Sequence, residues 1–240
     1  MYKTPGILNR VVEHNIYSYM LTFVILIKIL KRNEMIIKQF PVGPFQMNAY
    51  IIHEKEGTEC LLIDPADDLN ILYTYIAENN LQPKAIFNTH AHIDHVRYLS
   101  KVKDKLGIPF YLAKEELPLL ENLKQQGVMF GIDTAEPAEV DHFLEEGQSY
   151  AIGEHTFTLR HAPGHSPGSI CFVFENDVIC GDVLFYDSIG RTDLYMGNYD
   201  QLIESIKTKL MIMNDAVRVH PGHGPITTIG RERTFNPFLR

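Results

Sequence analysis

One short segment, NTHAHIDH at residues 88–95, places four side chains of the kinds that bind metals within six residues: His90, His92, Asp94 and His95. Residues two apart in an extended segment point to the same side, so His90 and His92 can face one ion together. If the chain turns into a helix near Ile93, Asp94 and His95 are redirected and can face a second ion. Helix-capping or surface histidines do not explain the alternation with apolar residues. The segment therefore predicts a metal site where a strand gives way to a helix.

Three later segments each add one candidate ligand just after an apolar run. His165 lies between two Pro-Gly turns in HAPGHSPGS (161–169), Asp182 follows Gly181 in VICGDVLF (178–185), and His223 lies in VHPGHGP (219–225). An aspartate after so apolar a strand would be a costly buried charge unless it were paired or bound to a metal. Its two oxygens can bridge two cations, and Gly181 lets the backbone come close.

The expected ligands form two sets that share Asp182. The first metal is expected at His90, His92, His165 and Asp182, and the second at Asp94, His95, His223 and Asp182. Imidazole and carboxylate ligands suit zinc, iron or manganese, so we expect two divalent ions, with zinc first and iron or manganese as alternatives. His161 is interpreted as structural, because the rigid loop is built around His165. His220 is left open between ligand, core and solvent.

Charge and cysteine content limit the class of protein. The net charge is −8, which argues against a general binder of phosphate backbones, so no nucleic-acid partner is expected. The chain has three cysteines, an odd number without close pairs, at Cys60, Cys171 and Cys180. They are interpreted as buried, reduced residues of a cytoplasmic protein rather than a disulfide framework. The oligomeric state is not predicted.

The first 34 residues differ from the rest. The apolar run Met20 to Leu30 is interrupted by Lys28 and is shorter than the ~20 residues needed to span a bilayer. We expect the working domain to be residues 35–240, beginning near Met35, and residues 1–34 to be an extension, either a mis-called start or a short apolar helix. Stable membrane insertion is not expected, and tethering by residues 17–30 is the minority alternative.

The rest of the chain predicts an α/β (α+β) fold. β-branched and apolar runs predict strands at 36–40, 48–54, 60–64, 85–89, 109–113, 155–161, 169–175, 177–182 and 216–221. Helical patterns fall at about 68–79, 94–106, 114–124 and 199–213, and residues 125–150 are expected to be connecting loops. Both halves combine strands with a few helices, which favours two sheets packed face to face with helices outside.

From about Met35 to Arg240 the chain resembles the metallo-β-lactamase-fold superfamily, whose ligand order is H-x-H-x-D-H, then His, Asp and His. The segments QMNAYII, THAHIDH, APGHSPGS, GDVLF, SIGRTDL and PGHGPITTIGRERTFNPFL most resemble the glyoxalase II-like (hydroxyacylglutathione hydrolase-like) group in a short single-domain form. The resemblance implies an αββα four-layer sandwich and a binuclear site that hydrolyses thioesters such as S-lactoylglutathione. Longer members carry a C-terminal helical domain that helps to hold glutathione, and this sequence ends soon after His223.

The implied chemistry is hydrolysis by a metal-bridging hydroxide. Two cations ~3.5–4 Å apart lower the pKa of a shared water toward neutrality, and Asp94 and Asp182 are the expected catalytic carboxylates. The resemblance places a cationic substrate contact at Arg191, which a salt bridge to Asp193 would equally explain. Tyr186 is a second candidate substrate contact. Asp64 is a candidate partner of a ligand histidine, or a cap for the following turn.

Several alternatives remain. A persulfide dioxygenase with one iron has a similar R-T-D element, but its histidine follows alanine where this chain has PGHG. A lactonase would use the same ligands with a different pocket. A nuclease is disfavoured by the acidic balance, and β-lactamase activity is not expected because no cysteine replaces Asp182. A binding protein without activity is disfavoured by the full ligand set.

Overall fold

The computed structural model describes residues 34–240, and Met35–Arg240 form one compact unit. The predictions made for the N-terminal extension fall almost wholly on residues 1–33, outside the described part of the chain. Within the described part, no helix has the length and apolar character needed to cross a membrane.

The first sheet contains six strands in the order of the sequence: β1 (Ile36–Val42), β2 (Met47–His53), β3 (Glu59–Ile63), β4 (Gln82–Phe87), β5 (Phe110–Ala113) and β6 (His142–Leu144). The first three pair antiparallel, and β3 to β6 pair parallel. Parallel neighbours need crossovers. These carry α2 (Leu69–Glu78), then α3 (Ile93–Val96) with α4 (Leu99–Leu106), and finally η1 (Lys114–Glu116), α5 (Leu117–Glu121) and α6 (Leu123–Phe130).

The second sheet runs in the order β14-β13-β10-β9-β8-β7. Its strands are β7 (Ser149–Ile152), β8 (His155–His161), β9 (Ile170–Val173), β10 (Asp177–Gly181), β13 (Arg218–Pro221) and β14 (Thr227–Thr228). Between β10 and β13 lie the small hairpin β11 (Leu184–Phe185) and β12 (Ser188–Ile189), and the helix α7 (Tyr199–Ser205), which continues as the π-helical turn η2 (Ile206–Leu210). The last helix is α8 (Ile229–Phe235).

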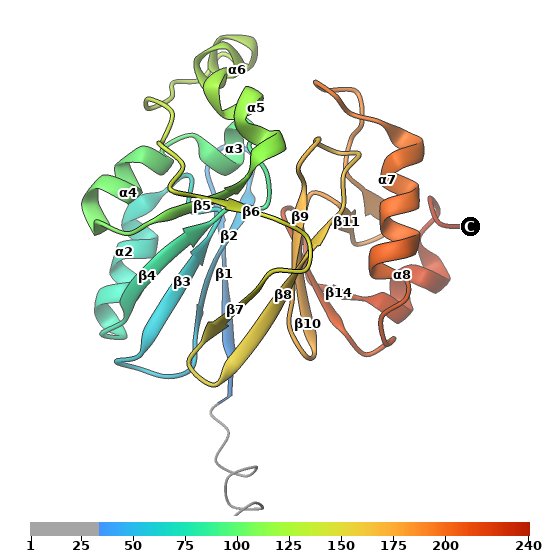
Figure 1. Cartoon of the computed structure of the whole chain (residues 1–240), viewed down its shortest axis with the longest axis horizontal. Helices are drawn as coiled ribbons and strands as arrows, with labels where there is room; N and C mark the ends of the chain where they lie inside the picture. Colours follow the sequence, from blue (N-terminus) through green and yellow to red (C-terminus); the bar gives the residue numbers. More distant parts are fainter. Residues whose placement is uncertain (1–33) are drawn as a thin grey trace, which may run out of the picture. The chain divides into compact units, whose positions relative to one another are not determined.

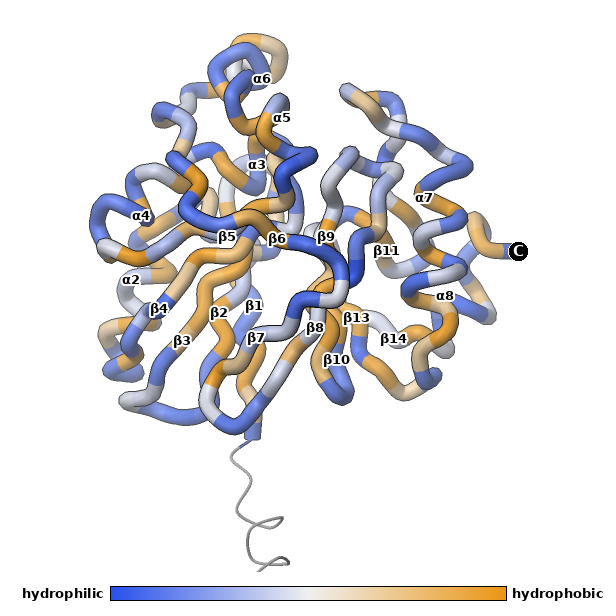
Figure 2. The backbone as a smooth tube through the Cα atoms, in the orientation of Figure 1, coloured by the Kyte–Doolittle hydropathy of each residue, from blue (hydrophilic) through white to orange (hydrophobic). Residues whose placement is uncertain are grey.

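The two sheets face each other, with α2 and α4 outside the first and α7 and α8 outside the second (Figure 1). Between them lies an aromatic core in which Phe87 of the first sheet packs edge-on against Phe157 and Phe172 of the second. All seven residues of β2 are buried, as expected for a strand covered on both faces, and Figure 2 shows apolar residues concentrated in the strands. The predicted αββα four-layer sandwich is thereby confirmed.

One predicted segment is wrong in part. Residues 125–150 are predicted from the sequence to be loops, yet α6 continues to Phe130 and both β6 and the start of β7 fall inside the range. The apolar pattern of a helix is missing from this polar stretch, because only Leu123 and Gly127 of α6 are buried. Gly127 is needed there, because a Cβ at this position would lie 2.8 Å from the carbonyl oxygen of Ile132. Residues 227–235, for which no element is predicted, form β14 and α8.

Candidate metal centre

The segment after β4 has the predicted change of direction. His92 is extended (φ −67, ψ 153) and directly precedes α3, which begins at Ile93. The segment is held from both sides. Thr89 donates its backbone N–H (2.8 Å) and its hydroxyl (2.7 Å) to the carboxylate of Asp64, and Asn88 donates to the carbonyl of His95 (2.6 Å). These contacts fix the turn that aims the imidazoles and carboxylate inward.

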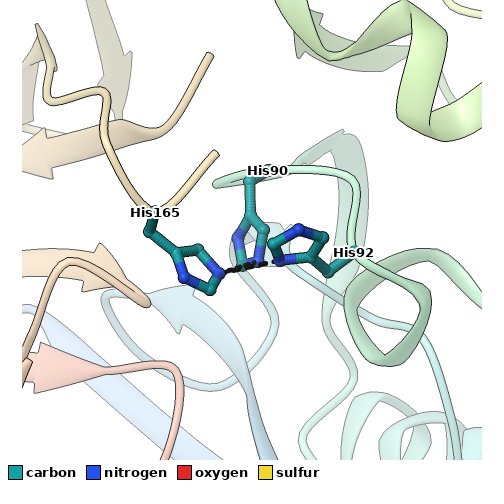
Figure 3. A group of neighbouring side chains, drawn as sticks. All are labelled: His90, His92 and His165. Carbon is teal, nitrogen blue, oxygen red and sulfur yellow. Dashed lines mark hydrogen bonds between the residues drawn. The ribbon is translucent and has the colours of Figure 1, made fainter. Parts of the chain in front are cut away.

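Three histidine rings from two distant loops point at one another (Figure 3). The Nε2 atom of His165 lies 3.1 Å from Nε2 of His90 and 2.8 Å from Nδ1 of His92. All three side chains are buried. The structure thus brings together the three imidazoles that the sequence assigned to the first metal.

Outer hydrogen bonds fix where the protons of two of these rings, His165 and His90, lie. The Nδ1–H of His165 donates to the carbonyl of Arg191 (2.8 Å), so its Nε2 carries a lone pair. The hydroxyl of Thr89 gives its proton to Asp64, so at 3.0 Å it accepts from Nδ1–H of His90, whose Nε2 is then also a lone pair. Two lone pairs facing each other repel. A cation between the rings would remove that repulsion, so these residues fit a metal ion.

A second group forms around Asp94, His95 and His223. The Nε2 atom of His223 lies 3.0 Å from Oδ2 of Asp94, and Nε2 of His95 lies 3.8 Å from the same oxygen. Outer contacts turn Nε2 of both rings inward, because Nδ1 of His95 donates to Asp64 (2.9 Å) and Nδ1 of His223 to the carbonyl of Phe45 (3.2 Å). Imidazole nitrogens and carboxylate oxygens face one another here, and they are a donor set for a divalent cation that displaces the protons from the two rings.

Asp182 lies between the two groups. Its Oδ1 is 3.5 Å from Nε2 of His95, and its Oδ2 is 3.6 Å from Nε2 of His165 and 3.5 Å from Nε2 of His223. A carboxylate in this position can bridge two cations. Its Oδ1 is buried and has no hydrogen-bond partner among the described residues, and the same is true of Nε2 of His95.

The electrostatics divide the centre into two halves. Burial lowers the pKa of His90 well below its ordinary value, and burial together with His165 lowers the pKa of His92 to about 3. These rings are neutral, which is the form that binds metals. Burial would also lower the pKa of His95. The carboxylates of Asp64, Asp94 and Asp182 nevertheless raise it well above the ordinary value. Burial would raise the pKa of Asp182, yet the surrounding imidazoles, His95 foremost, hold it well below its usual range.

Close backbone approach explains two glycines of the motifs. Gly181 has φ +51, and a Cβ there would lie 2.5 Å from the hydroxyl oxygen of Thr89. A Cβ on Gly222 would lie 2.0 Å from Oδ1 of Asp182 and 3.0 Å from Cε1 of His95. A side chain at Gly181 would displace Thr89, and one at Gly222 would push Asp182 or His95 out of the centre.

The turn that carries His223 belongs to the second sheet but is held by the first. Asn48 of β2 donates its amide to the carbonyls of Pro221 (3.0 Å) and Gly224 (2.9 Å), and the hydroxyl of Tyr50 donates to Pro221 (2.6 Å). These roles of Asn48 and Tyr50 were not predicted from the sequence. The one signal in the sequence was the position of Asn48 as a polar residue inside an apolar strand.

A pocket of about 420 Å³ opens onto the centre. Its floor includes His92, Asp94, His165, Asp182 and His223, and its walls are mostly apolar, formed by Phe45, Ile93, Phe130, Phe185, Ile189 and Leu194. Phe45 and Phe130 make an edge-to-face pair with ring centroids 5.7 Å apart. No pattern in the sequence indicates this pair, because the two rings come from distant segments. The pocket can hold a small ester or thioester against the centre.

The remaining predicted residues lie as follows. Arg191 forms the predicted ion pair with Asp193, which is bidentate (2.7 Å for each bond). Arg191 also lines the pocket, and its contact with a substrate stays a prediction. Tyr186 is absent from the pocket lining, and its ring lies 3.5 Å from the guanidinium carbon of Arg231. Asp64, with φ +50, holds His95 and Thr89 as described.

Two further histidines of the same motifs lie away from the centre. His161 hydrogen-bonds within its own loop, to the carbonyl of Pro167 at 3.0 Å. His220 is buried and lies 2.6 Å from Asp177, which leaves it no part in either group. The site therefore assembles from the ends of β4, β10 and β13 and the loop after β8.

Residues 42–223 match the family model described as the metallo-beta-lactamase superfamily. The chain belongs to this superfamily. The match includes every residue of the two groups described above. The superfamily is one of metal-dependent enzymes, in agreement with the donor set.

Similar members carry several different names. The hydroxyacylglutathione hydrolase GloC of Haemophilus influenzae is 37% identical over 207 residues, covering 85% of this chain and 97% of that protein. The crystal structure of BLEG-1 B3 metallo-beta-lactamase is 42% identical with a TM-score of 0.77, covering 85% of this chain and 99% of the other. TTHA1623, solved in a di-iron-bound form, is 38% identical with a TM-score of 0.77, covering 84% and 100%.

Proposed function

We propose that this protein is a binuclear metal-dependent thioester hydrolase of the glyoxalase II type, acting on S-lactoylglutathione or related acyl thiols. The observation that carries the proposal is the position of Asp182 within 3.6 Å of imidazole nitrogens of both groups: its Oδ2 lies between His165 and His223, and its Oδ1 lies near His95. Similarity to GloC, a hydroxyacylglutathione hydrolase by name, supports the thioester assignment.

The proposed ligands are the seven residues of the two groups. His90, His92 and His165 hold one ion and Asp94, His95 and His223 the other, with Asp182 shared. Zinc, iron and manganese all suit these donors, and the di-iron form of TTHA1623 makes iron a serious candidate. When bound, two such ions supply a water of near-neutral pKa and polarise the substrate carbonyl.

The side chains of this protein have three tasks in the proposed reaction. Asp94 and Asp182 hold acceptor oxygens on the pocket floor, where they orient the attacking water. The apolar walls exclude bulk water and hold the acyl group against that floor. Arg191 supplies a positive charge at the pocket wall for an acidic arm of the substrate.

The leaving group explains why no separate acid is needed. A free thiol has a pKa near ~8.5, so a thiolate departs from the tetrahedral species with little help from a proton donor. An amide or alkyl ester would need such a donor. Of the other pocket-lining donors, Gln126 is committed to backbone contacts, Ser188 donates its hydroxyl to the carbonyl of Ile189 (3.5 Å), and Arg191 is permanently charged. The pocket therefore suits thioesters, whose leaving group needs no proton donor.

The test combines metal analysis with a substrate panel. The purified full-length protein is assayed for bound metal and for thiol release from S-lactoylglutathione, other acyl thioesters and lactones. We expect two ions per chain and thiol release at least a hundredfold above a variant lacking Asp182. One iron per chain, with oxygen consumed in the presence of a persulfide and no thiol released, would establish the dioxygenase alternative instead.

A second candidate activity is β-lactam hydrolysis. It is not expected from the sequence, because Asp182 is not a cysteine, but similarity to BLEG-1, a B3 metallo-beta-lactamase by name, favours including it. A lactam nitrogen is a poorer leaving group than a thiolate, so we expect a chromogenic cephalosporin to be cleaved more slowly than thioesters. The compartment proposed is the cytoplasm, in agreement with three free, buried cysteines among the described residues.

A further inference from the structure

A buried carboxylate outside the ligand set joins the two loops that carry the three-histidine group. Glu116 ends the short helix η1 and has no exposed surface. Its Oε2 accepts from the backbone N–H of Ala91 at 2.7 Å, and its Oε1 accepts from the backbone N–H of Gly168 at 2.6 Å. Ala91 lies between His90 and His92, and Gly168 lies in the loop of His165.

The contacts leave this carboxylate little freedom to move. A Cβ on Gly168 would lie 2.8 Å from Cγ of Glu116 and 3.0 Å from Cβ of Ala113, so the glycine is needed for the close approach. Ala91 and Gly168 both lie outside the helices and strands, so their amides depend on an acceptor of this kind. A charged acceptor with two donors at these distances forms strong, short hydrogen bonds. The two loops are therefore tied to one rigid point.

A second side chain from the same crossover holds the first of these loops. Gln126 of α6 accepts from the N–H of Ile93 at 2.9 Å and donates to the carbonyls of Ala91 (3.1 Å) and Leu119 (2.8 Å). These partners all belong to the crossover segments of the first sheet. Glu116, in contrast, hydrogen-bonds to both of the chain segments that must meet at one ion.

We propose that Glu116 is a positioning residue that sets the distance between His165 and the His90–His92 pair, and thereby the affinity of the three-histidine metal site. The inference rests on the proposed metal centre. The second site does not depend on this link, because His223 is held by Asn48 and Phe45 and His95 by Asp64. The effect of Glu116 is thus specific to one site.

The test is Glu116→Gln, which keeps the shape but replaces one acceptor oxygen with a donor NH₂. Zinc affinity is measured by chelator competition in two backgrounds. In His223→Ala the three-histidine site is observed alone, and we expect a loss of about 10- to 100-fold, the usual effect of removing a partner of a metal ligand. In His165→Ala the other site is observed, and its affinity stays within about twofold, because the contacts that hold His95 and His223 do not involve Glu116.

Two further measurements separate positioning from general stability. The exposed neighbour Glu115 is the matched control, and Glu115→Gln leaves both affinities unchanged. Hydrogen exchange at the amides of Ala91 and Gly168 accelerates in Glu116→Gln but not in the control. If Glu116→Gln fails to fold, Gly168→Ala displaces the same carboxylate from the other side and must show the same selective loss.

The outcomes are distinguishable. Equal loss at both sites together with a lower melting temperature, or no loss at the three-histidine site, overturns the positioning role while leaving the binuclear centre intact. Failure of the wild-type protein to bind two ions overturns the proposed function itself, and with it this inference.

Discussion

The contact between Asp64 and His95 allows a sharp prediction about the second metal site. The carboxylate of Asp64 accepts from the N–H of Thr89 (2.8 Å), from the hydroxyl of Thr89 (2.7 Å) and from Nδ1–H of His95 (2.9 Å). In Asp64→Asn one oxygen can still accept from the backbone, but the other becomes an NH₂ donor facing two donors. His95 then gains by moving its proton to Nε2.

In that neutral tautomer the nitrogen that faces Asp94 and Asp182 carries the proton and cannot bind a metal. A metal ion can bind only after the tautomer is restored, at the loss of a hydrogen bond to a charged acceptor, about 1.5–3 kcal/mol. Since about 1.4 kcal/mol corresponds to tenfold in an equilibrium constant, we expect zinc affinity at the second site to fall about 10- to 100-fold. The backbone is not disturbed, because asparagine tolerates the left-handed φ of +50 at this position.

The assay is chelator competition together with NMR of the imidazole nitrogens, which reports the tautomer of His95 directly. Asp68→Asn is the matched control, because Asp68 is exposed and also has a left-handed φ of +44. Asp64→Asn with unchanged second-site affinity, or with His95 still protonated at Nδ1, would refute the assignment of Asp64 as the group that fixes the tautomer.

Three more predictions concern a buried ion pair, the substrate contact and the metal itself. Burial would raise the pKa of Asp177, but His220 and Arg218 hold it below the ordinary value of 3.8. The ionised carboxylate therefore stabilises the folded state at neutral pH, and this contribution is lost as the pH falls through the lowered pKa. Asp177→Asn should therefore reduce the free energy of unfolding by about 1.5–3 kcal/mol at pH 7. Urea titrations should show that the difference from wild type vanishes in acid. A difference that stays constant with pH contradicts the stabilising role of the ionised carboxylate. Arg191→Ala should raise KM for S-lactoylglutathione several-fold and not for an uncharged thioester, because Arg191 is the only Lys or Arg among the described pocket-lining residues. Asp193→Asn frees the guanidinium and should lower KM. Equal KM values in the wild type and both variants exclude the contact. A strong chelator should abolish thiol release and lower the melting temperature, with zinc or iron restoring both; activity that survives complete metal removal excludes the proposed chemistry.

Strong local patterns predicted much of the fold. Strands such as β2 and β8 were found within a residue or two of their predicted bounds, because continuous apolar or alternating runs have few other solutions. The short elements β6, β11, β12 and β14 were not predicted, because two or three residues carry too little pattern. Most of helix α6 was not predicted, because few of its residues face the core and its Gln126 binds the loop around Ile93 instead.

The sequence alone determined the chemistry of the centre. Its seven donor side chains, the change from extended chain to helix at Ile93 and the glycines beside Asp182 are local properties, fixed by residue type and spacing. Only the tertiary structure decided which nitrogen of each ring faces inward, since that depends on acceptors such as Asp64 and the carbonyls of Arg191 and Phe45, which lie far from the rings in sequence. The same holds for Glu116, an ordinary glutamate in the sequence that becomes the link between two loops because three separate segments meet around it.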